Sequence, residues 1–248
     1  MKYLYFICFY ILLVSCKKTN YNLKKITAKT IELDGSIESD KSFEKIIKPY
    51  KEKLSSEMNS LLCYAPKNFV KNDGNMQSSL GNLMADLCYE MGTPFFKDKT
   101  NLNIDFAMFN SGGLRSPIPL GDVTTENAFK LMPFENELVV VELSGDKIEE
   151  LIHYFVGNKK AHPLSKNVSL LIRENDYDLR INGQKFDKNK TYNVVTSDYL
   201  QSGGDRMNFF KNPKKLTKLN YKVRDAVIDY FKKVDTLKTT IDKRVIVE

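Results

Sequence analysis

The chain has 248 residues, of which 42% are hydrophobic, and this is enough for one sizeable core or two small ones. Only two residues are histidines, which excludes a metal centre built on several histidine ligands. The net charge is +7, but the 38 basic residues include only six arginines, and the lysines are scattered. A scattered lysine excess is typical of a solvated surface, so nucleic-acid binding is not expected.

Residues 1–15 are predicted to be an export signal. Lys2 supplies a positive charge, and the apolar run over 3–14 is too short to span a bilayer as a stable helix. The run ends in Leu-Val-Ser before Cys16, which resembles the lipobox of bacterial lipoproteins. We expect Cys16 to be acylated, residues 16–25 to form a lipidated tether, and the protein to be anchored to a membrane, facing the periplasm. The alternative is an ordinary secretory signal with a chance cysteine.

Residues 26–248 are predicted to form one domain. It begins with a short strand at 26–33 and a helix over 42–58, whose apolar residues follow one stripe. A stronger helix is predicted over 78–91, with Gly92 and Pro94 ending it. Residues 103–109 carry apolar side chains on both faces and therefore predict a central strand.

The second half of the domain mixes strands and helices. A buried strand is predicted over 138–143, followed by a helix that Ser144 caps. Further strands are predicted at 168–173, 178–181 and 192–196, with a turn at Asn182-Gly183. A helix over 222–233 and a strand at 244–247 complete the chain. Because helices and strands do not alternate strictly, we expect an α+β fold, with a mixed β-sheet flanked by helices.

The cysteines and histidines of the domain give no catalytic pattern. Cys63 and Cys88 could form a disulfide in an oxidising periplasm, or they could be two buried free thiols, because Cys88 lies on the apolar side of its helix. Neither has a histidine nearby in a pattern typical of a nucleophile. His153 and His162 are expected to be ordinary surface residues.

The segment from Asn110 to Arg115 directly follows a predicted buried strand. Backbone N–H groups at its two consecutive glycines can meet an anionic or polar ligand. Asn110 offers a donor and an acceptor, and Arg115 is the first arginine in the chain. Arginine in place of lysine indicates bidentate recognition of phosphate or carboxylate, although a tight turn with a surface arginine fits equally well.

Two further segments combine an aromatic residue with polar ones. Tyr199 precedes two glycines and Asp205, which could accept hydrogen bonds from vicinal hydroxyls such as those of ribose, or could simply stabilise a turn. Phe134, between Pro133 and polar residues, could stack on a ring-shaped ligand or be a buried loop residue.

A fourth segment, Leu-Gly-Asn-Leu-Met-Ala-Asp over 80–86, lies on a predicted helix. Asn82 and Asp86 share one polar face, and a solvated helix face explains that pair well. Together, the four segments supply an arginine, two aromatic rings, an asparagine and an aspartate. Because an anion, a flat base and a diol are the parts of a nucleotide, this convergence predicts a nucleotide site.

The sequence resembles the C-terminal, substrate-binding domain of 5'-nucleotidases and UDP-sugar hydrolases. The resemblance is carried by four motifs in order along the chain: LGN-x-x-AD, N-x-GG-L-R, PF-x-N and the Tyr-then-GGD segment. The resemblance covers about residues 40 to 235. It implies the following substrate-binding set: Asn110, Gly112, Gly113, Arg115, Phe134, Asn136, Tyr199 and Asp205.

The resemblance also implies individual roles. Phe134 and Tyr199 would sandwich the nucleobase, Asn110 would contact the base, Arg115 the phosphate and Asp205 the ribose. The two glycines after Asn110 would pack against the nucleoside.

The sequence departs from the family pattern in several places. One or two arginines usually precede the LGN segment, whereas here Met76 stands at roughly that place and Lys71 is a possible substitute. Tyr199 stands where phenylalanine is common and keeps the stacking face. Arg206 follows the GGD segment, where the family continues with glycine.

In the family, a separate N-terminal domain with two metal ions carries out hydrolysis, and its motifs do not occur in this sequence. The resemblance therefore implies no catalytic residue and no metal ligand here, and divalent metals only in a partner. Three hypotheses follow: a nucleotide-binding domain that acts with a separately encoded metallophosphoesterase, a non-catalytic nucleotide- or nucleoside-binding lipoprotein, and a degenerate domain that has lost its ligand.

Overall fold

The computed structural model describes residues 22–174 and 176–248, so the predicted signal peptide and Cys16 lie outside the described residues. The chain divides into two units between residues 48 and 49, and the described part of the first unit is residues 22–48. In the first unit, residues 22–33 are exposed and have no regular structure. The strand predicted over 26–33 is therefore wrong, because alternating apolar residues give a stable strand only where a neighbouring strand pairs with it.

The helix predicted over 42–58 is confirmed as α2, Lys41–Met58. Its predicted apolar stripe is exposed throughout: Ile46, Ile47, Tyr50 and Leu54. The periodicity thus predicted the helical conformation without predicting a buried face.

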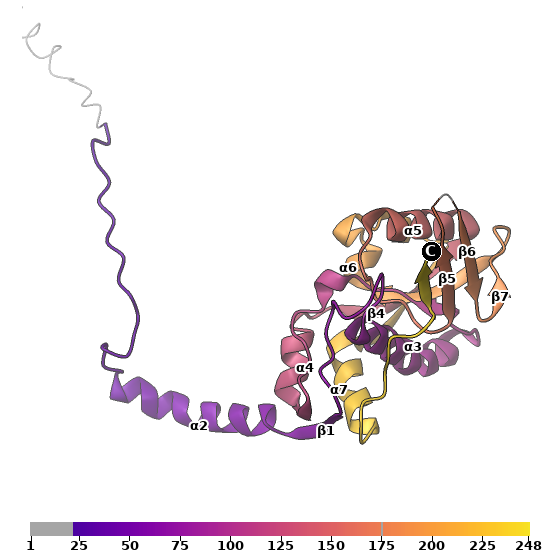
Figure 1. Ribbon diagram of the computed structural model, residues 1–248. Coiled ribbons are helices and arrows are strands. Elements are labelled where there is room, and N and C mark those ends of the chain that lie inside the picture. The colour runs from indigo at the N-terminus through magenta and orange to yellow at the C-terminus, as the bar shows by residue number, and fades with distance from the viewer. Residues whose placement is uncertain (1–21, 175) are drawn as a thin grey trace, which may run out of the picture. The chain divides into compact units, whose positions relative to one another are not determined.

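A four-stranded mixed sheet with the order β2-β8-β4-β9 organises the second unit. Figure 1 labels its strand β4. The strands are β2 (Phe106–Ala107), β8 (Thr191–Ser197), β4 (Glu137–Ser144) and β9 (Lys215–Lys222). β2 is parallel to β8, whereas β4 is antiparallel to both β8 and β9. Four consecutive buried residues, Leu138–Val141, give β4 two buried faces, as a central strand requires.

A second four-stranded sheet has the order β10-β5-β6-β7. Its strands are β5 (Val168–Ile172), β6 (Tyr177–Ile181), β7 (Gln184–Lys185) and β10 (Val245–Val247). Asn182 and Gly183 join β6 to β7 with φ values of 52° and 77°. A two-residue hairpin turn with positive φ at both positions favours Asn-Gly, so the predicted turn is confirmed. A smaller sheet pairs β1 (Leu61–Ala65) with β3 (Gly121–Thr124).

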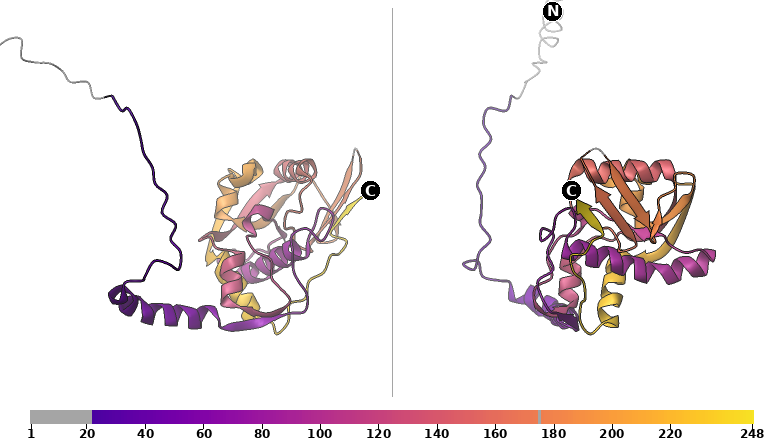
Figure 2. Two further views of the ribbon diagram at one scale, coloured as in Figure 1. Left: turned by 60° about the vertical axis from the view of Figure 1, so that its left-hand side comes forward. Right: turned by 45° about the vertical axis from the view of Figure 1, so that its right-hand side comes forward.

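Helices α3 (Ser79–Thr100) and α5 (Gly145–Asn158) contact the main sheet from opposite sides (Figures 1 and 2). α7 (Val223–Lys233) packs against α3 and against α4 (Thr125–Leu131), and the short α6 (Asp198–Gln201) follows β8. Three 3-10 turns, Ser111–Gly113, Gly204–Arg206 and Asn208–Phe210, complete the elements of this unit. None of the helices in the described ranges is long and apolar enough to cross a membrane.

α3 begins where predicted, with the Ser78 side chain accepting a hydrogen bond from the Gly81 N–H, but it ends nine residues later than the expected Met91. Gly92 does not end the helix. A Cβ atom there would lie 3.3 Å from a methyl group of Leu219, so the missing side chain gives room for close packing against β9. The helix continues through Pro94 because the next turn buries Phe96 in the core, and this burial offsets the lost backbone hydrogen bond.

The strand predicted over 103–109 is much shorter than expected. Only Phe106–Ala107 form β2, and the Met108 N–H adds one further hydrogen bond to the Val195 carbonyl of β8. The residues after β2 are apolar because they are buried, although they do not extend the strand: Met108 and Phe109 are both buried.

Candidate functional site

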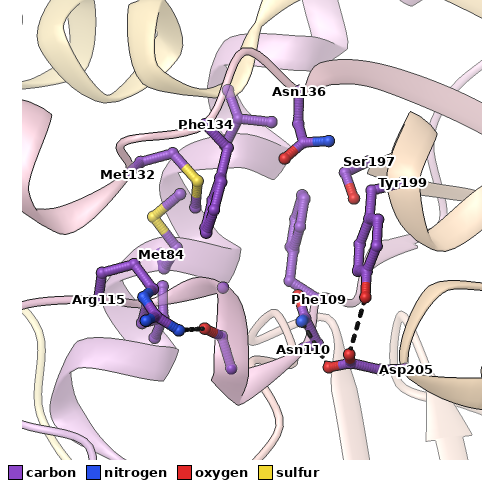
Figure 3. A pocket seen from close by; sticks show the side chains of 14 residues that line it. Met84, Phe109, Asn110, Arg115, Met132, Phe134, Asn136, Ser197, Tyr199 and Asp205 are labelled. Carbon is purple, nitrogen blue, oxygen red and sulfur yellow. Dashed lines mark hydrogen bonds between the residues drawn. The ribbon is translucent and has the colours of Figure 1, made fainter. Parts of the chain in front are cut away.

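A cavity of about 310 Å³ lies at one edge of the main sheet (Figure 3). β2, β8 and β9 end at this edge and the antiparallel β4 begins there, since Leu138 pairs with Ser197 and Glu137 pairs with Lys222. The sheet topology therefore brings four segments that are far apart in the sequence to one place. All eight residues of the predicted substrate-binding set line this cavity: Asn110, Gly112, Gly113, Arg115, Phe134, Asn136, Tyr199 and Asp205.

Two aromatic side chains face each other across the cavity. Phe134, in the loop between α4 and β4, is 41% exposed, and Tyr199, on α6, is 44% exposed. Figure 3 shows their rings on opposite walls, with the buried ring of Phe109 between them. Large exposed rings that line a cavity can each offer a face to a flat ligand.

The carboxylate of Asp205 is held by two neighbours (Figure 3). The Asn110 side-chain amide donates to one oxygen at 2.6 Å, and the Tyr199 hydroxyl donates to the other at 3.0 Å. The Tyr154 hydroxyl also donates to the Asp205 backbone carbonyl at 2.9 Å. Asp205 has a left-handed backbone with φ 52°, which aspartate tolerates better than most residues. The arrangement fixes the direction of a carboxylate that still has lone pairs for a ligand.

The glycine pairs make room for this polar cluster. A Cβ atom on Gly113 would lie 2.8 Å from the Asn110 side-chain oxygen, and one on Gly204 would lie 2.4 Å from the Tyr199 ring. Gly112 lies against the Asp205 carboxylate, where a Cβ atom would be 3.4 Å from Oδ2. The glycines thus allow Asn110, Asp205 and Tyr199 to approach one another.

Arg115 lies at an exposed part of the cavity wall. Its guanidinium carbon is 5.9 Å from the centre of the Phe134 ring, and Nη1 donates to the Gly112 carbonyl at 3.4 Å. Neither Lys71, the possible substitute for the missing arginines, nor Met76, which stands at roughly their place, lines the cavity. Lys71 donates to the Leu114 carbonyl at 2.8 Å, and Met76 is buried.

Asp198 connects the two aromatic walls and was not singled out from the sequence. Its Oδ1 accepts hydrogen bonds from the Asn136 side chain at 3.0 Å, the Glu137 N–H at 3.1 Å and the Tyr199 N–H at 2.7 Å. Its place at the start of the Tyr-then-GGD segment was the only sequence signal, because Asn136 and Glu137 lie about 60 residues earlier.

Arg224 anchors the loop that carries Phe134 and was also not singled out from the sequence. Its nearly buried guanidinium donates to the Phe134 carbonyl at 3.3 Å, forms an ion pair with Glu135, and lies 4.3 Å from the Phe129 ring centre. The hydrogen bond from Arg224, together with one from Lys222, lowers the pKa of Glu135 to about 2. The loop that carries Phe134 is therefore anchored by charge on one side and by Asp198 on the other.

His162 is not a surface residue, contrary to expectation. It is 4% exposed, and its Nδ1 accepts a hydrogen bond from the Ser111 N–H at 3.2 Å, directly beside Asn110. Burial, together with the charge of Lys160, lowers the pKa of His162 from its ordinary 6.5 to about 4, so the ring is neutral at pH 7. Sequence reasoning missed it because its neighbours come from distant segments. His153 is exposed, as predicted.

The LGN-x-x-AD segment has a structural role. Asn82 is buried and donates to Gln77 and to the Thr240 carbonyl. Asp86 pairs with Arg244, whose side chain is 3% exposed. The predicted polar face of this helix thus holds the C-terminal segment in place, and only Met84 of this motif lines the cavity.

Cys63 and Cys88 are both buried free thiols, so the disulfide alternative is not formed. Burial raises the pKa of Cys63 to about 11 and that of Cys88 further, which makes both poor nucleophiles. Within the described ranges, no three side chains of histidine, cysteine, aspartate or glutamate group together in a way that could hold a metal ion.

A sequence model of the family described as "5'-nucleotidase, C-terminal domain" matches residues 62–212, more than half of the chain. The chain belongs to the 5'-nucleotidase C-terminal domain family. Protein UshA of Escherichia coli (strain K12) is 33% identical over 108 residues, which are 41% of this chain and 19% of that protein. All four segments quoted for the resemblance lie within the matched range.

Two solved nucleotidase structures share the fold of this chain. The 5'-nucleotidase precursor from Thermus thermophilus superposes with a TM-score of 0.66 at 20% identity, over 82% of this chain and 42% of that one. The NAD nucleotidase of Haemophilus influenzae gives a TM-score of 0.57 at 17% identity, over 84% and 41%. The predicted α+β class is therefore confirmed, and this chain spans less than half the length of these relatives.

Proposed function

We propose that this chain is the nucleotide-binding domain of a 5'-nucleotidase-type system, acting in nucleotide catabolism or salvage with a separately encoded metallophosphoesterase. The observation that carries the proposal is the pair of exposed rings, Phe134 and Tyr199, that face each other across a cavity holding Asp205 and Arg115. Membership of the 5'-nucleotidase C-terminal domain family supports the same conclusion.

In this proposal, a nucleobase inserts between Phe134 and Tyr199, each of which contributes about 1–3 kcal/mol by stacking. Asp205 accepts hydrogen bonds from the ribose hydroxyls, and Arg115 contacts the phosphate. Asn110, Asn136 and the two glycines after Ser111 complete the contacts to the nucleoside. In the same proposal, the metal ions that activate water belong to the partner enzyme.

Binding is tested first, by titrating the purified chain without its signal peptide with AMP, adenosine and UDP-glucose in a calorimeter. We expect at least one of them to bind and Phe134→Ala to weaken that binding at least fivefold. If the ligand titrations of Phe134→Ala and Tyr199→Ala match those of the unchanged chain, the domain is degenerate and the proposal is wrong.

The partner is tested by measuring phosphate release from AMP. A metallophosphoesterase encoded in the same genome is assayed alone, with this chain, and with the Phe134→Ala variant. We expect the unchanged chain to increase the rate and the variant to increase it less.

A second candidate function is a tethered nucleotide or nucleoside receptor without a catalytic role. The observation that favours it is that Asn110 and Tyr199 already hold the Asp205 carboxylate in the absence of a ligand, so the site is organised for binding by the chain alone. Tight binding together with no effect on any metallophosphoesterase would identify this function. Either role fits our proposal that Cys16 anchors an exported lipoprotein, which mass spectrometry of membrane-extracted protein tests directly.

A further inference from the structure

Two charged residues line the cavity, and they have opposite signs. Arg115 is the one cation and Asp205 the one anion among the lining residues, and the other twelve are neutral. Most of the wall is apolar or aromatic, with Met84, Phe109, Leu114 and Met132 beside the two facing rings. This lining is suited to a neutral flat group with a few hydroxyls, whereas a nucleoside monophosphate adds about two negative charges.

Arg115 is poorly placed to bind the phosphate charges strongly. It is exposed, and its guanidinium lies beside the Phe134 ring with one long hydrogen bond to the Gly112 carbonyl. Ion pairs between solvent-exposed groups are screened by water and salt, and a single one changes an affinity by about fivefold at most.

Three cations near the cavity wall already make other contacts. Lys71 donates to the Leu114 carbonyl at 2.8 Å, on the same segment as Arg115. Arg224 and Lys222 both pair with Glu135, and Arg224 also holds the Phe134 carbonyl. None of the three lines the cavity, and recruiting any of them for a phosphate would break a contact that the loop uses.

We infer that the site selects the nucleoside part of its ligand and holds a nucleoside almost as tightly as its 5'-monophosphate. This inference rests on the proposed function, because it takes the ligand to be a base and sugar with or without phosphate. A phosphate that meets only one exposed guanidinium stays open to water and to a second protein, which suits a domain whose partner hydrolyses that phosphate.

Calorimetry on the purified chain at about 150 mM salt tests the inference, using the matched pairs adenosine with AMP and uridine with UMP. We expect the monophosphate to bind no more than about fivefold more tightly than its nucleoside. A larger ratio for the pair that binds overturns the inference while leaving the proposed function in place. If no member of either pair binds but UDP-glucose does, the inference is overturned. If none of these ligands binds, it is the proposed function that fails.

Two variants separate the contributions. Arg115→Gln should lower the ratio of AMP affinity to adenosine affinity by the same factor of about five or less, with Lys185→Gln on the exposed strand β7 as the matched control for loss of one charge. Phe134→Ala should weaken both ligands equally. If Arg115→Gln abolishes AMP binding while adenosine still binds, the phosphate dominates recognition and the inference is wrong.

Discussion

The side-chain amide of Asn136 donates a hydrogen bond of 3.0 Å to the carboxylate of Asp198, and this bond joins the two walls of the cavity. The same carboxylate oxygen accepts the backbone N–H groups of Glu137 and Tyr199. One side chain thus fixes both the loop that carries Phe134 and the first turn of α6, which carries Tyr199. The separation of the two rings therefore depends on a residue that does not itself line the cavity.

Replacement of Asp198 by alanine should weaken ligand binding through the rings. We expect a loss of about 1–3 kcal/mol in stability, because three donors lose a charged acceptor, and a loss of affinity in calorimetry. The affinity loss should become smaller when Phe134 is already alanine, because only the part that acts through Tyr199 remains, and a double-mutant cycle detects this coupling. Asp198→Asn keeps an acceptor oxygen and should restore part of both. Additive losses in the cycle would contradict a positioning role.

Removal of the Tyr199 hydroxyl separates two contributions of this residue to binding: stacking by the ring, and the hydrogen bond that orients the Asp205 carboxylate. Tyr199→Phe retains the ring and loses the 3.0 Å hydrogen bond to Asp205, whereas Tyr199→Ala loses both. We expect the phenylalanine variant to lose about 0.5–1.5 kcal/mol of binding free energy, as for a typical hydrogen bond, and the alanine variant about 1–3 kcal/mol more. Equal affinities of the two variants would show that the ring contributes nothing to binding.

A methyl group at Gly204 should displace the Tyr199 ring. The new Cβ atom would lie 2.4 Å from a ring carbon, a distance that requires the ring to move. Gly204→Ala is therefore expected to weaken ligand binding as much as Tyr199→Ala. Gly157→Ala is the control: nothing lies within 4 Å of its Cβ position in α5, so it should keep the affinity and gain roughly 0.5–1 kcal/mol of stability.

Acidification should destabilise the fold through His162. Its pKa is about 4 in the folded protein and near 6.5 when unfolded, so between these values the unfolded chain binds a proton that the folded chain does not. Above about pH 6.5, His162 does not lower the free energy of unfolding. As the pH drops from there to about 4, the free energy of unfolding falls by roughly 3 kcal/mol. Urea unfolding across this range should show the fall.

A matched pair of variants assigns that pH dependence. His162→Gln keeps an acceptor for the Ser111 N–H and cannot titrate, so the fall between pH 6.5 and 4 should become shallower. His153→Gln, at the exposed second histidine, should leave the slope unchanged. An unchanged slope in His162→Gln would mean that other groups cause the acid sensitivity.

Local pattern alone predicted most elements of the second unit. The strands β4, β5, β6 and β8 and the helix α7 lie within one residue of their expected bounds, and α5 begins directly after Ser144, as expected. Burial follows the strand or helix period in β5, β6, α5 and α7, and β4 contains a short continuous apolar run, so both patterns can be counted in the sequence. The predictions were wrong where contacts between distant residues decide the structure. Leu219 packs against Gly92, so α3 continues past its predicted end. Residues 26–33 do not form the predicted strand, because no neighbouring strand pairs with them.

By itself, the sequence determined the four motifs and their order, because glycine pairs, aromatic residues and rare arginines at strand ends are local signals. The family resemblance that these motifs carry then named the eight residues that line the cavity. The tertiary structure alone decided what holds them. Asp198, Arg224 and His162 act on partners 51 to 90 residues away, and Asp86 anchors Arg244 at a separation of 158. Hydrogen bonds and ion pairs over such separations depend on how the sheet edge assembles, and no spacing along the chain records them.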